Sequence, residues 1–316
     1  MPASEEAGDL NESNNSMCVK AGGLEEKNIL HIQDVYKIYG NKVVLDNVDL
    51  SVARGEFCTV VGPSGCGKST LLRLILGQER PTSGELFIDG CPGESANRER
   101  GIVYQKYSLF PHLTVLENVV LGKELCAGMV ERFRRHKTFE EEAMHFLEKV
   151  QLGEHCNKYP HELSGGMQQR VAIAQAVIMN PSILLMDEPF GALDPGTRES
   201  MQVFILEIWE KTKMMIFFVT HDLEEACYLG TRIVVLSQFY SDGRKNNGNK
   251  GAKIVADYPL PRKATSTMVK AQASFGELIQ KIRQAGFDPK HLQHVTEFNL
   301  RHDDSFQTLT PEEAQR

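Results

Sequence analysis

A run of residues, Gly62–Thr70, has the composition and spacing of a phosphate-binding loop. Its sequence GPSGCGKST fits the pattern G-x-x-x-x-G-K-[ST], follows the apolar segment Phe57–Val61 and precedes the run LLRLIL. Glycines let the backbone N–H groups of such a loop turn toward an anion, and the positive end of the following helix points at the same anion. We expect Lys68 to neutralise the β- and γ-phosphates of a nucleotide and Ser69 to offer its hydroxyl to Mg²⁺. The alternative is a Gly-rich turn without a ligand.

The whole loop is expected to surround the phosphates. Its members are Gly62, Pro63, Ser64, Gly65, Cys66, Gly67, Lys68, Ser69 and Thr70. Gly62 and Gly67 are the glycines that the pattern requires, and Gly65 adds conformational freedom between them. We interpret Cys66 as a small tolerated side chain and not as a nucleophile.

Two acidic residues, Asp187 and Glu188, follow the apolar segment Ile183–Met186. Adjacent residues on a strand point to opposite faces, so the two carboxylates are expected to have different roles. One would bind Mg²⁺ with Ser69, partly through water, and the other would orient or deprotonate an attacking water. Pro189 has no N–H to donate and is expected to end the strand. An Asp-Glu pair alone is as readily a solvated strand end, and the phosphate loop upstream favours the catalytic interpretation.

A second helix start that could bind an anion lies in LSGGMQQR, Leu163–Arg170. Ser164 stands at or near the N-cap, and Gly165 and Gly166 expose backbone amides just beyond it. Taken alone, Ser-Gly-Gly at a helix start is equally consistent with simple capping.

The elements that must position these groups alternate between strands and helices. Short apolar segments typical of buried parallel strands are Phe57–Val61, Glu85–Ile88, Gly101–Tyr104, Ile183–Met186, Met214–Val219 and Ile233–Leu236. Strand signals are absent between Thr114 and Asn180. One helix is expected to open at the capping-box pair Thr114 and Glu117. Others are expected through Phe139–Val150 and from near Ser164. The pattern predicts an α/β core with an inserted helical subdomain.

Composition and charge exclude some classes of protein. The chain has 316 residues, 41% of them hydrophobic and 24% charged, which is enough to bury a sizeable core. A net charge of −7 argues against a nucleic-acid-binding surface. The first residues are polar and acidic without the apolar region of a secretory signal, and we expect them to be disordered. No apolar run reaches the roughly 20 residues that cross a bilayer. We therefore expect a soluble polypeptide whose membrane role, if any, comes through a partner.

The phosphate loop, LSGGMQQR and ILLMDEP, in this order, resemble the nucleotide-binding subunits of ABC transporters. The resemblance covers about residues 29–238. It implies an α/β fold of the P-loop NTPase class, the ABC cassette, with a parallel sheet core, an antiparallel β subdomain, an inserted helical subdomain and a short C-terminal extension. The expected boundaries are a disordered tail at 1–28, a nucleotide-binding domain at 29–240 with its helical subdomain at about 106–180, and a linker and extension at 241–316.

The extension is expected to hold a polar linker, a short strand near Lys253–Tyr258 and one amphipathic helix. The apolar residues of this helix fall at i, i+3, i+4 and i+7 and are Phe275, Leu278, Ile279 and Ile282. Gly286 stands where a C-terminal cap would be expected.

The resemblance assigns further residues to the site. Tyr39 matches the aromatic residue that stacks on adenine, with Tyr36 as the alternative. Gln105 matches the glutamine that touches Mg²⁺ and the attacking water, and His221 matches the histidine that contacts the γ-phosphate. Asp194, in GALD, belongs to the loop that crosses to a partner subunit.

In this family the signature of one subunit closes over the phosphate loop of another. The resemblance therefore implies a head-to-tail dimer with two ATP sites, most simply a homodimer, with a mixed dimer as the alternative. The signature residues expected to face the partner's nucleotide are Ser164, Gly165, Gly166 and Gln168. Glu188 would position the attacking water, and Asp187, Ser69 and Gln105 would hold Mg²⁺, partly through water.

The loop after Gln105 displays Leu109, Phe110 and Leu113 around Pro111. These residues could be core. In transporter ATPases the equivalent surface receives a short helix of the permease, and such a surface suits a helix-in-groove contact. The resemblance thus implies transmembrane permease subunits and, indirectly, a solute-binding protein as partners, no nucleic acid, and a peripheral position at the cytoplasmic face of the inner or plasma membrane.

The stretches MDEPFGALDPGTRE and THDLEEACYL are most similar to the branch that imports nitrate, sulfonates, taurine and related small solutes. This resemblance implies an ATP-hydrolysing subunit of an ABC importer. The alternatives are an exporter or lipid-extraction ATPase and a soluble ABC ATPase without a transport role.

Overall fold

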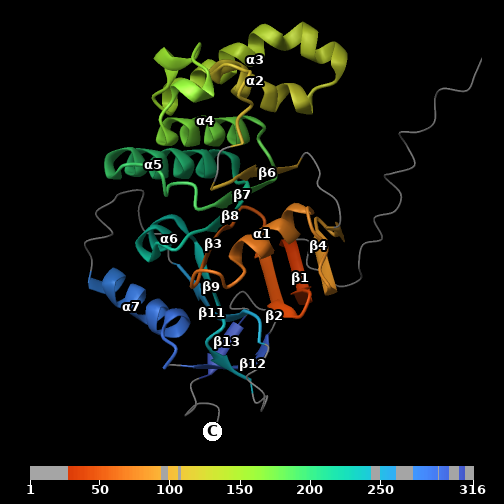
Figure 1. Ribbon diagram of the computed structural model, residues 1–316, viewed down its shortest axis with the longest axis vertical. Helices are drawn as coiled ribbons and strands as arrows, with labels where there is room; N and C mark the ends of the chain where they lie inside the picture. Colours follow the sequence, from red (N-terminus) through yellow and green to blue (C-terminus); the bar gives the residue numbers. More distant parts are fainter. Residues whose placement is uncertain are drawn as a thin grey trace, which may run out of the picture.

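The computed structural model describes the chain over residues 28–93, 99–105, 108–242, 250–260, 273–290, 292–298 and 306–309. The predicted disordered tail, apart from Asn28, and residues 243–249 of the predicted linker lie outside these stretches. Figure 1 shows a helical part at one end of the molecule, sheets and helices in the middle, and the C-terminal elements at the other end.

The described part of the chain contains a central sheet of six strands. In spatial order they are β11 (Lys253–Pro259), β9 (Arg232–Ser237), β3 (Phe57–Val61), β8 (Met215–Val219), β7 (Ile183–Asp187) and β6 (Arg100–Val103). From β9 to β6 the pairs are parallel, and β11 is antiparallel to β9. Every residue of β3 and β8 is buried, as expected for parallel strands covered on both faces. The chain leaves β3, β7 and β8 at the same edge of the sheet, where the predicted site residues follow.

A second sheet is antiparallel. Its strands, in spatial order, are β2 (Lys42–Ala53), β1 (Asn28–Tyr39), β4 (Ser83–Ile88) and β5 (Cys91–Pro92). Glu85–Ile88 is a strand, as predicted. The prediction that it belongs to the parallel core was wrong, because β4 pairs antiparallel with β1 in this second sheet. In this strand Leu86 and Ile88 are buried while Ser83 is exposed, which is typical of a strand with one covered face.

Helix α1 (Lys68–Leu76) lies between the two sheets. Its Leu71, Leu74 and Ile75 pack in one hydrophobic cluster with residues of β1, β2, β3 and β7. The first turn of α1 is therefore fixed in the middle of the molecule, directly after β3 (Figure 1). This position holds the phosphate loop between two layers of buried apolar side chains.

A helical part is inserted between β6 and β7. It contains α2 (Val115–Cys126), α3 (Met129–Lys149) and α4 (Gly165–Ile178). The predicted capping box is present, because Thr114 accepts from Glu117 N and the Glu117 carboxylate accepts from Thr114 N. Helix α3 begins well before the predicted segment Phe139–Val150, since the side chains described in its first half are polar and exposed and show little apolar periodicity.

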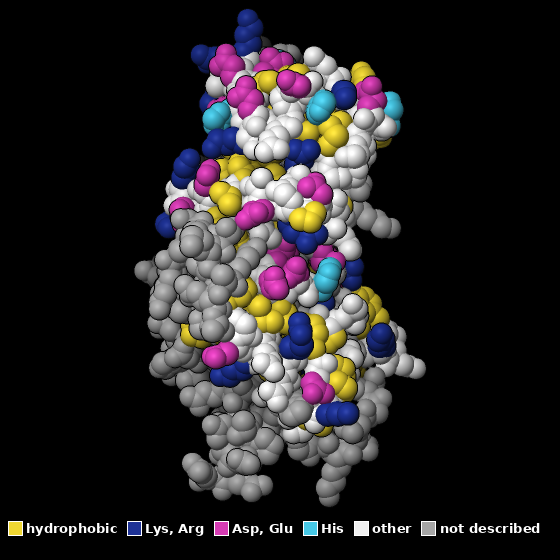
Figure 2. All heavy atoms as spheres, turned by 90° about the vertical axis from the view of Figure 1, so that its left-hand side faces the viewer, with side chains coloured by type: hydrophobic (Ala, Val, Ile, Leu, Met, Phe, Trp, Pro, Cys, Tyr) yellow, Lys and Arg dark blue, Asp and Glu magenta, His cyan; other side chains and the backbone are white. Residues whose placement is uncertain are grey.

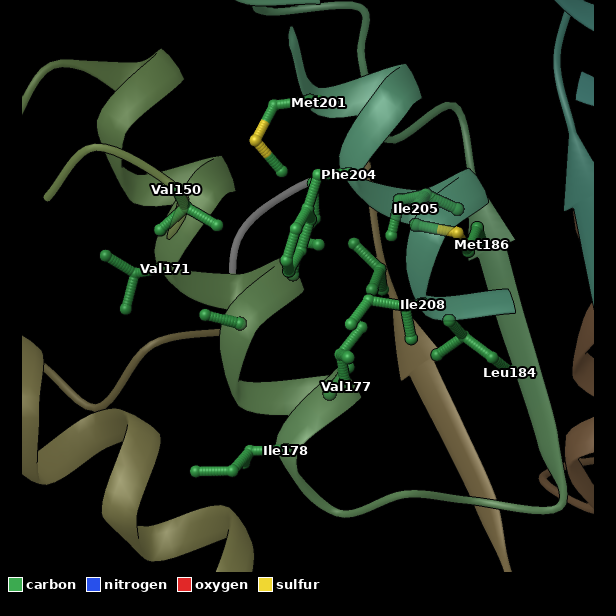
Figure 3. Packing of buried hydrophobic residues seen from close by; sticks show 14 of the residues in the cluster. Val150, Val171, Val177, Ile178, Leu184, Met186, Met201, Phe204, Ile205 and Ile208 are labelled. Atoms are coloured by element: carbon green, nitrogen blue, oxygen red, sulfur yellow. The ribbon is translucent and has the colours of Figure 1, made fainter. Parts of the chain in front are cut away.

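Helix α5 (Pro195–Thr212) shares one apolar cluster with the helical part and the central sheet. Figure 3 shows residues from three sources facing one another in one buried cluster. They are Val150, Val171, Val177 and Ile178 from the helical part, Leu184 and Met186 from β7, and Met201, Phe204, Ile205 and Ile208 from α5. The helical part thus packs on the sheet directly, through α4 against β6, and shares its apolar cluster with α5.

The remaining described α-helices and strands pack near β3, β9 and β11 of the central sheet. They are α6 (Leu223–Leu229), β10 (Tyr240–Ser241), α7 (Ala273–Phe287), β12 (Gln293–Phe298) and β13 (Phe306–Leu309). Helix α7 buries Phe275, Ile282 and Ala285, and the last two pack with residues of α6, β9 and β11. Gly286 lies inside this helix and does not cap it, which corrects the prediction; a Cβ at this position would lie 2.2 Å from Val235 Cγ1.

The sequence did not predict the strands β12 and β13, which with β10 form a small sheet of their own in the described residues. Among the helices that the structure describes, none combines the length and the apolar character that crossing a membrane would require. The domain boundaries stay a prediction.

Candidate active site

The phosphate loop can have its observed shape only with glycine at its two ends. A Cβ on Gly62 would lie 2.0 Å from the carbonyl oxygen of Leu236. Gly67 has a φ of 100°, and a Cβ there would lie 2.9 Å from Leu45 Cδ2. The two glycines of the pattern are therefore required by close backbone approach and by a left-handed conformation.

Lys68 is buried and folds back across the loop. Its Nζ donates to the carbonyl oxygens of Gly62, at 2.8 Å, and of Pro63, at 3.0 Å. An ammonium group has three N–H donors, so a cation in this position also suits an anion held by the loop amides. The arrangement fits the phosphates of a nucleotide.

Two other loop residues turn their side chains into the protein. Cys66 is buried, and burial raises the pKa of its thiol. Thr70 is also buried, and its hydroxyl accepts from Arg73 Nη2 at 3.2 Å. Ser64 and Ser69, by contrast, are exposed. Cys66 and Thr70 can therefore serve the ligand only through their backbone.

Asp187, at the end of β7, is hydrogen-bonded to the hydroxyl of Ser69. Burial raises the pKa of Asp187, while the hydrogen bond with Ser69 and the charge of Lys68 act in the opposite direction. Carboxylate and hydroxyl oxygens are ligands that suit Mg²⁺, which also keeps several waters. No cluster of three His, Cys, Asp or Glu in the described residues could hold a metal ion. The oxygen atoms of Ser69 and Asp187 fit a Mg²⁺ ion whose other ligands would be water and phosphate oxygens.

Glu188 lies beyond the strand in a left-handed backbone conformation, with a φ of 47°. Its N–H donates to Val219 O at 2.9 Å. The Oε1 atom is 3.2 Å from His221 Nδ1, and the Oε2 atom accepts from Gln105 Nε2 at 3.1 Å. The structure thus brings the three predicted catalytic residues together from the ends of β6, β7 and β8.

The predicted separation of the two acids has a different cause from the one we expected. Strand β7 ends at Asp187, so alternation along a strand does not orient Glu188. The positive φ of Glu188 orients it instead, and non-glycine residues adopt this conformation rarely. Asp187 contacts Ser69, whereas Glu188 contacts His221 and Gln105.

Tyr39, the candidate for the adenine, has an exposed ring with 41% of its surface accessible. Its hydroxyl donates to Glu79, and the Nζ of Lys37 lies 5.0 Å from the ring centroid. Glu79 also pairs with Lys37 at 3.0 Å and with Arg73 of α1 at 2.8 Å. The hydrogen bond from Tyr39 is the largest cause of the lowered pKa of Glu79. Sequence reasoning missed Glu79, because no local pattern indicates a pairing that folding creates. Tyr36, the alternative, is partly buried.

The signature residues lie at the start of α4. Ser164 is its N-cap and accepts from Met167 N at 3.3 Å, with Gly165 as the first helical residue. A Cβ on Gly166 would lie 3.3 Å from Ala192 O. Gln168 donates to the backbone oxygens of Pro160 and Leu163, at 2.9 and 3.2 Å, so its amide is engaged within its own subunit.

Asp194 is the N-cap of α5 and accepts from Thr197 N at 3.1 Å. Hydrogen bonds from Thr197 lower the pKa of Asp194. Figure 1 places α4, which begins after Ser164, in the helical part, and α1, which begins at Lys68, between the sheets. Gln169, a further residue that sequence reasoning missed, donates from α4 to Tyr104 O at 3.2 Å and so links α4 to the backbone just before Gln105.

Comparison with known proteins gives one consistent result. Residues 45–191 match the family model described as ABC transporter. The chain is 48% identical over 212 residues to an uncharacterized ABC transporter ATP-binding protein of Methanocaldococcus jannaschii, covering 66% of this chain and 77% of that protein. It is 41% identical over 241 residues to an aliphatic sulfonates import ATP-binding protein of Bacillus cereus, covering 76% and 87%. A nitrate import ATP-binding protein of Synechocystis is 45% identical over 213 residues, with 66% and 77% covered.

A solved structure of a dimeric ATP-binding cassette in a post-hydrolysis state, bound to ADP and Pi, is similar as well. It has a TM-score of 0.63 and 32% sequence identity, and the match covers 74% of this chain and 100% of that chain.

Proposed function

The chain belongs to the ABC transporter family as an ATP-binding subunit that hydrolyses ATP with Mg²⁺, and we propose that it powers the import of a small solute through a separate permease. The observation that carries the catalytic part is the meeting of Glu188, His221 and Gln105 beside the phosphate loop. The importer part rests on the identity to sulfonate and nitrate import ATP-binding proteins.

Each group in the site has a defined task in this proposal. Lys68 and the loop amides hold the β- and γ-phosphates, and Mg²⁺ at Ser69 and Asp187 supplies positive charge against the charge that develops on the phosphate oxygens. Glu188 orients the attacking water and accepts its proton. His221 and Gln105 each contact one oxygen of Glu188 and so fix the direction of its carboxylate.

The subunit would act as a head-to-tail homodimer. Ser164 and Gly166 lie at the start of α4 in the helical part, and in this proposal a second copy supplies this helix start to the γ-phosphate. Asp194 begins α5 next to the signature and would lie at the same interface. The similar dimeric cassette supports this arrangement.

The helical part offers a surface for a permease helix. Asn118 is fully buried and binds the backbone of the preceding loop, accepting from Phe110 N at 2.8 Å and donating to Phe110 O at 3.1 Å and Leu113 O at 3.0 Å. The Phe110 side chain is nevertheless 42% exposed, while Leu109 and Leu113 are partly buried. The loop is held in place by Asn118 and exposes the ring of Phe110. This arrangement suits contact with a partner better than packing in the hydrophobic core.

A groove of about 510 Å³ lies on α2 and α3, close to this loop in the sequence. It is lined by Leu116, Lys137, Glu140, Glu141, Met144, His145 and Glu148. Figure 2 shows that the upper end of the molecule, where Figure 1 places these helices, carries side chains of both charges between scattered hydrophobic ones. This combination suits an amphipathic helix from a permease. The subunit would thus be peripheral, at the cytoplasmic face of the membrane, and the solute would be set by the permease and a solute-binding protein.

The proposal is tested by copurification. A tagged Glu188→Gln variant, expressed in the native host and purified from detergent-solubilised membranes with Mg·ATP, is expected to retain a multi-span permease that mass spectrometry identifies. Adding Phe110→Asp should remove the permease and leave ATP binding unchanged. Recovery of only soluble protein, ribosomes or nucleic acid would overturn the transport assignment and leave the ATPase chemistry intact.

A further inference from the structure

A buried carboxylate lies behind the loop that carries His221. Glu225, on α6, is only 5% exposed. Its Oε2 atom accepts from the hydroxyl of Thr220 at 2.7 Å, and its Oε1 atom accepts from Nε2 of Gln202 on α5 at 3.1 Å. Thr220 and Gln202 are buried as well. Removing these polar groups from water costs free energy, so we expect the buried network to have a structural or functional role.

The network holds both neighbours of His221. The N–H of Thr220 donates to Val60 O at 3.2 Å, and its hydroxyl accepts from Asp222 N at 3.1 Å. Asp222 in turn caps α6 and accepts from Glu225 N at 3.2 Å. The His221 side chain between them is 62% exposed, and its contact with Glu188 depends on where this loop places it.

Through Gln202 the network also reaches α5 and the loop that ends at its N-cap, Asp194. Gln202 and Arg198 lie on α5, one turn apart, and Asp194 is the N-cap of this helix. Arg198 donates to Leu193 O at 3.2 Å and its Nη1 atom is 4.0 Å from Asp222 Oδ2. Helix α5 therefore connects the loop that ends at Asp194, proposed to lie at the dimer interface, to the loop that carries His221.

We propose that Glu225 is a positioning residue that fixes the His221 loop to α5, so that closure of the dimer at Asp194 is transmitted to the contact between His221 and Glu188. The proposal rests on the ATP hydrolysis of the family and not on the importer assignment. Only a carboxylate accepts both hydrogen bonds at once, because an amide presents N–H donors to one of its two donor neighbours. Burial raises the pKa of Glu225, and the hydrogen bonds from Thr220 and Gln202 act against that shift.

The first test is the Glu225→Gln variant with Glu224→Gln as the matched control, since Glu224 is the exposed neighbour on the same helix. We expect Glu225→Gln to lower kcat for ATP about tenfold, equivalent to about 1.4 kcal/mol. The Kd for ATP should stay within about twofold. The control should match the wild type in both. An unchanged kcat in a folded Glu225→Gln variant, or an equal loss in ATP affinity, would overturn the proposal.

An exchange of the two partners tests the hydrogen-bond pattern itself and covers the case in which the single variant does not fold. In the Gln202→Glu/Glu225→Gln double variant the donor and the acceptor trade places, so the link between α5 and α6 is restored while the hydroxyl of Thr220 can still donate to the new amide oxygen. We expect kcat to return to within about threefold of the wild type. A folded exchange variant that stays as slow as Glu225→Gln contradicts the proposal.

A background that lacks the histidine separates positioning from a general structural role. Single-turnover hydrolysis of radiolabelled ATP is measured for His221→Ala and for His221→Ala/Glu225→Gln. Because Glu225 acts through His221, the second change should cause no further loss. A further tenfold loss would show that Glu225 acts elsewhere. Wild-type turnover and its loss in Glu188→Gln, measured in the same assay, confirm the underlying ATPase independently of these outcomes.

Discussion

The phosphate loop and the signature both precede a helix, and we propose that both helix starts face an anion, but the molecule builds them differently. The N-cap of α1 is Gly67, whose φ is positive and which has no side chain to cap the helix. The N-cap of α4 is Ser164, whose hydroxyl already accepts from Met167 N. The first helix start therefore keeps its amides for a ligand and adds the buried Lys68, whereas the second has part of its capacity satisfied and no cation in its first turn.

The surroundings of the two helix starts differ in the same way. Helix α1 is held between two sheets, while α4 packs on β6, at one edge of the central sheet. In the proposed homodimer the phosphate loop would be a nearly complete site, and the signature would be the complement that another copy presents. The difference predicts that changes at the phosphate loop and the catalytic acids affect binding or chemistry within one subunit. Changes at the signature should affect only the closed pair.

The largest expected effect is at Glu188. Replacing Glu188 with Gln keeps the size of the side chain and removes the group that accepts a proton, so ATP turnover should fall by roughly 10²–10⁴-fold. ATP affinity should remain. Turnover is measured by phosphate release and affinity by calorimetry, with Glu224→Gln as the control. Turnover close to that of the wild type would remove Glu188 from the proposed role.

The second largest effect, at Ser164, distinguishes the signature from the phosphate loop. Ser164→Arg places a bulky cation at the signature, and we expect turnover to fall by roughly 10²–10³-fold because the γ-phosphate loses its second helix start. The Kd of the monomer for ATP should stay the same, since the loop of its own chain is untouched. A loss of ATP affinity in the monomer would mean that α4 serves the nucleotide of its own subunit.

Lys68→Ala should weaken ATP binding by the monomer, which Ser164→Arg should leave unchanged. Loss of the buried ammonium removes a charge-assisted contact worth about 1.5–3 kcal/mol, so the Kd for ATP of the monomer should rise roughly 10- to 100-fold. Fluorescent-nucleotide titration of the variant beside Ser164→Arg measures this contrast. Equal affinities in the two variants would contradict the difference between the regions.

The smallest effect concerns the helical part alone. Thr114→Ala removes the capping box of α2 and should cost about 1 kcal/mol in free energy of unfolding. The hydrogen bonds from Thr114 lower the pKa of Glu117, so this contribution is present above the unfolded-state pKa and is lost as the pH falls through the folded-state pKa. Urea unfolding should therefore show a difference from the wild type that shrinks from pH 7 to pH 3. ATP affinity should not change.

Local patterns predicted the parts of the site that local chemistry defines. The phosphate loop, the strand before it and the cap at Ser164 follow from glycine spacing, apolar runs and N-cap preference. The meeting of Gln105, Glu188 and His221 came from the family resemblance, because three strand ends far apart in sequence must first share one sheet edge.

Other features depend on tertiary pairing and left no signal in the sequence. Glu79 contacts Tyr39 across two elements, and Glu225 contacts Gln202 from another helix. The apolar run of β4 resembles that of a parallel core strand, and only its partner β1 decides the sheet. Local spacing predicts Gly286 as a helix cap, because it gives no information about the close approach of Gly286 to Val235.

The most direct test is sedimentation equilibrium of the Glu188→Gln variant with and without Mg·ATP, beside the Ser164→Arg/Glu188→Gln double variant. The central claim is that the phosphate loop of one subunit is completed by the signature of another. We expect the single variant to be monomeric without ATP and dimeric with ATP, and the double variant to bind ATP but stay monomeric. A single variant that remains monomeric with bound ATP, while wild-type turnover per subunit is independent of protein concentration, would contradict the account.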